Sequence, residues 1–194
     1  KKTGVSLTHA EVQLEKYMVN NCYTGFFSLV QIFAAMNPEE AVYFANPGPV
    51  GKFNPRFYFK WADFNNNPIL EWQEFARSFL SIPLAHQIIG FYTIADKTDN
   101  TLKVMRSYQI YAAQKISDKV KNPSWTKKEQ PAGYIWHTTG SGKTMTSFKT
   151  AQLISENCDA EKIVFLIDRI ELGKQTYGEY SGFATADITI NDTE

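Results

Sequence analysis

A glycine-rich segment carries the clearest chemistry in this sequence. Thr139-Gly140-Ser141-Gly142-Lys143-Thr144 lies within YIWHTTGSGKTMTSF at 134–148. Glycines allow backbone amides to close on a phosphate oxygen, and a lysine neutralises the β- and γ-phosphates. A threonine hydroxyl directly after the lysine can ligate Mg²⁺. The segment therefore predicts a phosphate loop that binds ATP and Mg²⁺, with Thr144 as the metal ligand.

One position departs from the general motif G-x-x-x-x-G-K-[ST], whose eight positions here run from His137 to Thr144. The first glycine of that motif stands where a strand ends and holds no phosphate through a side chain. A histidine there need not disable the site. Two interpretations of His137 stay open: a side chain packed at the end of a strand, or a contact to nucleotide or to a coupled domain.

The loop needs flanking elements to position it, and the sequence predicts them. GYIWH at 133–137 predicts a short apolar strand before the loop, and 143–157 predicts a helix with an apolar stripe. KIVFLID at 162–168 is a continuous apolar run, as expected for a parallel strand covered on both faces. The order strand, phosphate loop, helix, strand predicts a βαβ unit and an α/β fold.

A segment upstream of the loop resembles the element that precedes the phosphate loop in superfamily 2 helicases. It runs from Arg106 through Gln109 to Ala112, on a predicted helix at 104–120. A glutamine amide offers one donor group and one acceptor, which fit the N6 and N7 edges of adenine. The resemblance implies that Arg106 and Gln109 help to bind ATP. The alternative is a glutamine that faces solvent.

A segment downstream, FLIDRIELGKQT at 165–176, has two interpretations. Asp168 could end a strand and hold Mg²⁺. We favour a resemblance to helicase motif Ia, which lines the nucleic-acid track, because Arg169 and not a glutamate follows the aspartate. Asp168, Arg169 and Gln175 are then expected to contact nucleic acid. No adjacent Asp-Glu pair follows Thr144, so on this interpretation the acidic pair for hydrolysis lies beyond residue 194.

The first half of the chain predicts further elements. Thr8 and Glu11 fit a capping box at the start of a helix over 8–20. The apolar segment 24–37 predicts a buried helix, and the polar segment 96–101 a linker. The remaining expected elements are strands at 41–46 and 57–61 and helices at 70–80 and 84–95, the last at least in its first half.

Composition sets broad limits. Lysine plus arginine and aspartate plus glutamate number 20 each, so net charge gives no support to a nucleic-acid or membrane role and does not exclude one. Cys22 and Cys158 form no zinc or disulfide pattern, which favours a cytoplasmic setting. No apolar run reaches the roughly 20 residues of a membrane span. The chain opens with KKTG rather than Met, and we expect it to be a piece of a longer protein.

Together these segments resemble the restriction (R) subunit of type I restriction-modification enzymes. The resemblance rests on GYIWHTTGSGKTMTSFKTAQL with its histidine, on VMRSYQIYAA and on VFLIDRIELGKQT, and less specifically on YFAN and KWADFNNNPI. It implies a PD-(D/E)xK-like nuclease domain followed by RecA-like motor domains. The implied division is the end of the nuclease domain at 1–95, a linker at 96–103 and the start of the first motor domain at 104–194.

The resemblance also implies an activity and partners. Subunits of this family use ATP to pull double-stranded DNA past the complex, cut it with Mg²⁺, and work with methyltransferase and specificity subunits. Lys1 matches the catalytic lysine of the nuclease, while the two acids that hold its metal would precede residue 1. Gln13 and Tyr17 match a Q-x-x-x-Y pattern, and the i, i+4 spacing puts both on one helical face. Without the resemblance, these residues are a solvated chain end and an ordinary helix surface.

Two other functions stay open from the sequence. One is a superfamily 2 helicase with an unrelated N-terminal domain, against which His137 and the Lys1, Gln13 and Tyr17 pattern argue. The other is a nucleotide-binding module without catalysis, which the missing Asp-Glu pair favours. As it stands, the chain is expected to bind ATP weakly and not to hydrolyse it.

Overall fold

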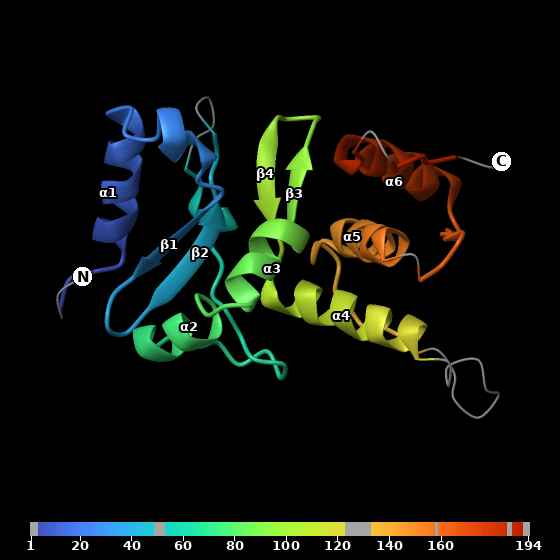
Figure 1. Ribbon diagram of the computed structural model, residues 1–194, viewed down its shortest axis with the longest axis horizontal. Coiled ribbons are helices and arrows are strands. Elements are labelled where there is room, and N and C mark those ends of the chain that lie inside the picture. Colours follow the sequence, from blue (N-terminus) through green and yellow to red (C-terminus); the bar gives the residue numbers. More distant parts are fainter. Residues whose placement is uncertain (1–3, 49–52, 123–132, 158, 186–187, 192–194) are drawn as a thin grey trace. The chain divides into compact units, whose positions relative to one another are not determined.

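A computed structural model describes residues 4–48, 53–122, 133–157, 159–185 and 188–191 (Figure 1). The chain divides into two compact units, Lys1–Ser107 and Tyr108–Glu194. Both helices and small sheets are present, so the protein is a mixed α/β structure. Lys1 lies outside the described residues.

The first unit begins with helix α1, Thr8–Val19, which confirms the helix expected over 8–20. The expected capping box is wrong, because the cap position falls on Leu7 and no side chain caps the helix. Thr8 is already the first helical residue, and its backbone N–H donates to the Ser6 hydroxyl at 3.3 Å. Helix α1 packs on strand β1, Ile32–Met36 (Figure 1).

The buried helix expected over 24–37 is also wrong. The segment forms a short 3₁₀ helix, η1 at Gly25–Leu29, followed by β1. Strand β1 pairs antiparallel with β2, Ala41–Ala45, so that Phe33 lies opposite Phe44. An apolar run of this length fits a helix or a buried strand, and the hairpin partner decides between them. Strand β2 confirms the strand expected over 41–46.

A cluster of buried side chains joins α1 to this hairpin, namely Leu7, Phe33, Ala35, Val42 and Phe44. A second, aromatic cluster forms around Tyr43, whose ring lies 4.4 Å from that of Phe79 and 6.0 Å from that of Trp61. The Tyr43 hydroxyl donates to the Met105 carbonyl at 3.0 Å. Buried aromatic pairs of this kind stabilise beyond the area that they cover.

The strand expected over 57–61 is replaced by smaller features. Pro55–Phe57 form the 3₁₀ helix η2, and Phe59 makes an isolated bridge with Tyr43. Helix α2, Trp72–Ser78, lies within the helix expected over 70–80. The Glu71 carboxylate caps α2 by accepting from the backbone N–H groups of Gln73 and Glu74.

Helix α3, Leu84–Phe91, is followed by strands β3, Thr93–Asp96, and β4, Thr101–Val104, which pair antiparallel (Figure 1). Residues 96–103, expected as a linker, thus form the turn of a hairpin and most of its second strand. Local pairing explains this difference, because the polar residues of the segment bond to one another. The boundary between the two compact units falls after Ser107.

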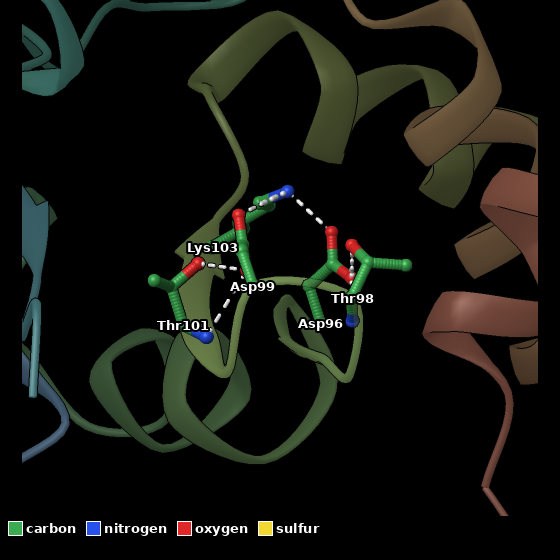
Figure 2. Close-up of polar contacts among 5 residues, drawn as sticks. All are labelled: Asp96, Thr98, Asp99, Thr101 and Lys103. Carbon is green, nitrogen blue, oxygen red and sulfur yellow. Dashed lines mark hydrogen bonds and ion pairs between the residues drawn. The ribbon is translucent and has the colours of Figure 1, made fainter.

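Figure 2 shows how polar side chains close that turn. The Lys103 ammonium bonds to the Asp96 carboxylate and lies 3.3 Å from that of Asp99. The Asp96 carboxylate also accepts from the Thr98 N–H at 2.9 Å and from its hydroxyl, and Asp99 does the same for Thr101. A turn rich in charge and hydroxyl groups can therefore be ordered without apolar packing.

The second unit contains three helices in its described part: α4 Ser107–Lys121, which starts one residue before the unit boundary, α5 Lys143–Glu156 and α6 Ile170–Phe183. The helices expected over 104–120 and 143–157 are confirmed by α4 and α5. The strands expected over 133–137 and 162–168 are not formed. Val164 and Leu166 are 87% and 93% exposed, so the second segment is not covered on both faces.

The reason for this difference is physical. A strand is stabilised by a hydrogen-bonded neighbour, and an apolar run only makes a sequence suitable for one. Neither segment pairs with another strand among the described residues. The βαβ unit is therefore incomplete here, although its loop and helix are present. No helix in the described ranges is long and apolar enough to cross a membrane.

Candidate nucleotide-binding site

The loop before α5 is tightly closed. Gly140 and Gly142 both adopt left-handed backbone conformations, with φ of 76° and 78°. The Ser141 N–H and hydroxyl both donate to the Thr138 carbonyl, at 3.3 and 2.7 Å. Left-handed conformations favour glycine, so the two glycines of the motif stand where the chain requires them.

Gly142 meets a second constraint. A Cβ at this position would lie 2.4 Å from Nε2 of Gln109. It is also the residue before the first turn of α5, and its carbonyl accepts from the Thr146 N–H at 3.0 Å. Amides in the first turn of a helix have no partner within the helix and can bind an anion.

Lys143 and Thr144 open helix α5 directly after this turn. The Lys143 ammonium donates to the Thr138 carbonyl at 2.9 Å and lies 3.5 Å from the His137 carbonyl. The loop thus folds around the side chain of Lys143, the residue expected to bind phosphate. Thr144 is half-buried in the same turn. Residues 139–144 thus lie in one closed turn at the start of α5, and their contacts with phosphate and Mg²⁺ stay a prediction.

Helix α4 holds the loop from one side. The Tyr108 hydroxyl donates to the Ser141 carbonyl at 2.8 Å, and the Gln109 amide nitrogen donates to the carbonyls of Ser141 and Gly142 at 3.0 and 3.2 Å. Gln109 is 1% exposed. Its amide donor therefore faces the phosphate loop, which the sequence did not indicate.

His137 lies at the start of the loop, against Tyr108. The two rings are 5.2 Å apart and inclined by 81°, an edge-to-face arrangement. Partial burial, and then the charge of Lys143, lower the pKa of His137 from its ordinary value. The imidazole is therefore neutral near pH 7, and its ring packs against an aromatic neighbour.

Helix α6 is tied to α5 by a second tyrosine. The Tyr180 hydroxyl donates to Ser147 Oγ at 2.9 Å, and Ser147 Oγ donates to the carbonyls of Lys143 and Thr144 at 2.9 and 3.1 Å. The rings of Phe148 and Tyr180 are 5.2 Å apart. The first turn of α5 is thus supported by α6 as well as by its own loop. Neither tyrosine contact could be found from the sequence.

The residues expected to contact nucleic acid lie at the start of α6. Asp168 is exposed before the helix, Arg169 occupies its cap position, and Gln175 is exposed in the helix. The Gln175 amide donates to the Glu179 carboxylate at 2.9 Å. All three residues are exposed.

The other expected site residues belong to the first unit. The Arg106 guanidinium lies 4.6 Å from the centre of the Phe59 ring, a cation–π contact. Gln13 is half-buried and Tyr17 is 43% exposed, one turn apart on α1. No group of three or more His, Cys, Asp or Glu residues that could hold a metal ion occurs in the part of the chain that the structure describes.

Comparisons with known proteins give the family of this chain. Residues 108–194 match the family described as SWI2/SNF2 ATPase. The whole chain is 38% identical to a type I restriction enzyme endonuclease subunit of Staphylococcus aureus (strain COL) and covers 20% of that protein. It is 37% identical over 97% of its length to the corresponding subunit of Staphylococcus saprophyticus, covering 19% of it.

A more distant relative is the endonuclease subunit of the Escherichia coli EcoprrI enzyme, 31% identical over 70% of this chain and 44% of the relative. The chain thus spans about a fifth of the length of the staphylococcal relatives. Their similarity includes both compact units and is not confined to the phosphate loop. This chain is a homologue, along its whole length, of the endonuclease subunits of type I restriction enzymes.

Proposed function

We propose that the chain is part of an ATP-dependent translocase and endonuclease that acts on double-stranded DNA. The observation that carries this proposal is the closed loop at residues 138–144, where two left-handed glycines, Lys143 and the start of α5 converge. Similarity to an ATPase family over 108–194 supports nucleotide binding. Similarity to restriction endonuclease subunits in both units favours this function over a helicase with an unrelated N-terminal domain.

In the proposed site, the amides of the loop and the Lys143 ammonium bind the phosphates of ATP, and the Thr144 hydroxyl ligates Mg²⁺. Arg106 and Gln109 contribute to binding of the nucleotide, with the Gln109 amide at the adenine edge. Both N–H groups of that amide donate to loop carbonyls in this structure, so a donor for adenine would require one of these two bonds to open when nucleotide binds. The second unit would be the start of a RecA-like motor domain.

DNA would be contacted at Asp168, Arg169 and Gln175, which are accessible at the start of α6. The first unit would be the end of a PD-(D/E)xK-like nuclease domain, with Lys1 assisting the attacking water and Gln13 and Tyr17 on the face of α1 turned to DNA or metal. Methyltransferase and specificity subunits are the proposed partners. By itself the chain would bind ATP weakly and not hydrolyse it, since no adjacent Asp-Glu pair follows Thr144.

The test is Lys143→Ala in the full-length subunit, assembled with its partners. Removing the ammonium takes away the positive contact to the β- and γ-phosphates, and we expect ATP hydrolysis and DNA translocation to fall to background. Lys162→Ala is the matched control, because Lys162 is an exposed lysine of the same unit outside the loop. ATP turnover by Lys143→Ala at the rate of the unaltered enzyme would refute the proposed site.

A further inference from the structure

Tyr108 contacts the phosphate loop at two places, its entrance at His137 and its middle at Ser141. Its hydroxyl donates to the Ser141 carbonyl at 2.8 Å, and its ring packs edge-to-face on His137 at 5.2 Å. Both contacts lie within the second compact unit, and they join helix α4 to residues about thirty positions later in the chain. A side chain that binds a loop at two places restricts the loop more than either contact alone would.

The hydroxyl contact has a consequence for the backbone amides. A trans peptide unit is planar, with its C=O and N–H pointing in opposite directions. Tyr108 and Gln109 both donate to the Ser141 carbonyl, so the N–H of Gly142, in the same peptide plane, points away from α4. The Gln109 amide also donates to the Gly142 carbonyl, which turns the N–H of Lys143 away in the same manner.

These two N–H groups are the ones that a phosphate loop offers to an anion at the start of its helix. Their direction is set before any nucleotide binds, because the carbonyl of each of these two peptide units accepts hydrogen bonds from α4. Preorganised donors of this kind avoid the cost of reorganising when the ligand binds. The contact with His137 restrains the entrance of the same loop.

We propose that Tyr108 is a positioning residue, which orients the Ser141–Gly142 peptide through its hydroxyl and holds the loop entrance through its ring on His137. This inference rests on the proposed nucleotide site, whose backbone amides Tyr108 would orient. It also assigns a role to His137, as the aromatic surface on which the Tyr108 ring packs. Partial burial and Lys143 lower the pKa of this imidazole, which keeps its ring uncharged beside the lysine.

The first test is Tyr108→Phe in the full-length subunit with its partners, measured by steady-state ATP hydrolysis. This change keeps the ring contact and removes one hydrogen bond. We expect the KM for ATP to rise about fivefold, as for the loss of one typical hydrogen bond. The kcat should stay within about twofold, because the loop amides bind the phosphates equally in the ground and transition states.

A merely structural role gives the opposite pattern. If Tyr108 only stabilised the fold, Tyr108→Phe would reduce the amount of active enzyme, so kcat would fall while KM stayed unchanged. That pattern, or unchanged values of both constants, would overturn the inference. Tyr177→Phe is the matched control, because Tyr177 is 41% exposed on α6, and both constants should stay as in the unaltered enzyme.

A double-mutant cycle separates the ring from the hydroxyl. His137→Ala combined with Tyr108→Leu should show coupling in KM of about threefold, since both changes remove the same aromatic contact. His137→Ala combined with Tyr108→Phe should show additive effects, because Phe keeps the ring. Equal coupling in both cycles, or none in the first, would contradict the assigned role of His137. Failure of the proposed function is distinct: the unaltered subunit itself would neither bind nor hydrolyse ATP.

Discussion

Gly142 shows how closely single residues constrain the loop. Its φ of 78° disfavours any residue with a Cβ, and that Cβ would lie 2.4 Å from the Gln109 amide nitrogen. The left-handed conformation alone costs about 1–2 kcal/mol for an L-residue. We therefore predict that Gly142→Ala displaces Gln109 and weakens ATP binding at least about tenfold. Equilibrium titration of the full-length subunit with a fluorescent ATP analogue measures this change.

Gly178→Ala provides the comparison. Gly178 lies within α6, and a Cβ there would meet no atom within 4 Å. Alanine is the better helix former, so this change should leave ATP affinity unaltered and slightly raise stability. If Gly142→Ala bound the analogue as tightly as Gly178→Ala does, the described packing of Gln109 beneath the loop would be incorrect.

For single residues, the sequence identifies the members of the loop but not the side chains that pack against it. Residues 139–144 could be recognised because phosphate chemistry restricts which residues can stand there and in which order. Tyr108 gave no such signal, since a tyrosine on a helix has many uses. Its partner Ser141 is 33 positions away, and only the packing of α4 against the loop brings the two together.

Among the elements, the β3–β4 hairpin depends most clearly on ionisation. Burial alone would raise the pKa of Asp96, but bonds from Lys103 and Thr98 outweigh it and hold that pKa below its ordinary value of 3.8. A carboxyl with a lowered pKa in the folded state contributes stability above its unfolded pKa, and loses it as pH falls through the folded pKa. The contribution of Asp96 should therefore be complete at pH 7 and decrease progressively below about pH 4, as pH falls through the lowered pKa.

We predict that Asp96→Asn lowers the free energy of unfolding by about 1.5–3 kcal/mol at pH 7, the range for hydrogen bonds to a charged group. The difference from the unaltered chain should shrink as pH falls below about 4. Urea unfolding followed by tryptophan fluorescence suits this test, since Trp61 is buried in the same unit. Asp99→Asn is the matched control, with a smaller effect, because Asp99 is 48% exposed. A difference for Asp96→Asn that persisted unchanged to pH 3 would contradict the assignment.

The elements that the sequence predicts correctly are those with a local cause. Helix α5 follows from an apolar stripe at helical spacing within one segment. The helix at 8–20 is present as α1, although the capping box from which it was expected does not form. The helix predicted for 24–37 is wrong because the apolar residues of this segment fit either a helix or a strand. Pairing with Ala41–Ala45 selects the strand. The strand predicted for 162–168 is wrong for a related reason. Its composition suits a buried strand, but a strand also needs a second strand to which its backbone can hydrogen-bond.

For the whole molecule, the residues proposed for nucleotide and those proposed for the nuclease fall mainly in different compact units. The residues proposed for nucleotide, apart from Arg106, lie in Tyr108–Glu194, while Gln13 and Tyr17 lie in Lys1–Ser107. The sequence alone suggested a similar division, but it placed a linker where a hairpin forms. The assignment of the first unit to a nuclease rests on similarity to the family, since neither its two-stranded sheets nor α1 identifies that chemistry by itself.

That division yields a prediction for the complete enzyme with its partners. Lys1→Ala should abolish cutting of circular double-stranded DNA, because the proposed nuclease loses the lysine that assists the attacking water. ATP hydrolysis should continue at the rate of the unaltered enzyme, since the phosphate loop belongs to the other unit. Lys2→Ala is the matched control, because it removes the neighbouring positive charge and should leave both activities intact. Cleavage by Lys1→Ala at the unaltered rate would refute the nuclease assignment. A parallel loss of ATP hydrolysis would instead show that the two activities are not separable.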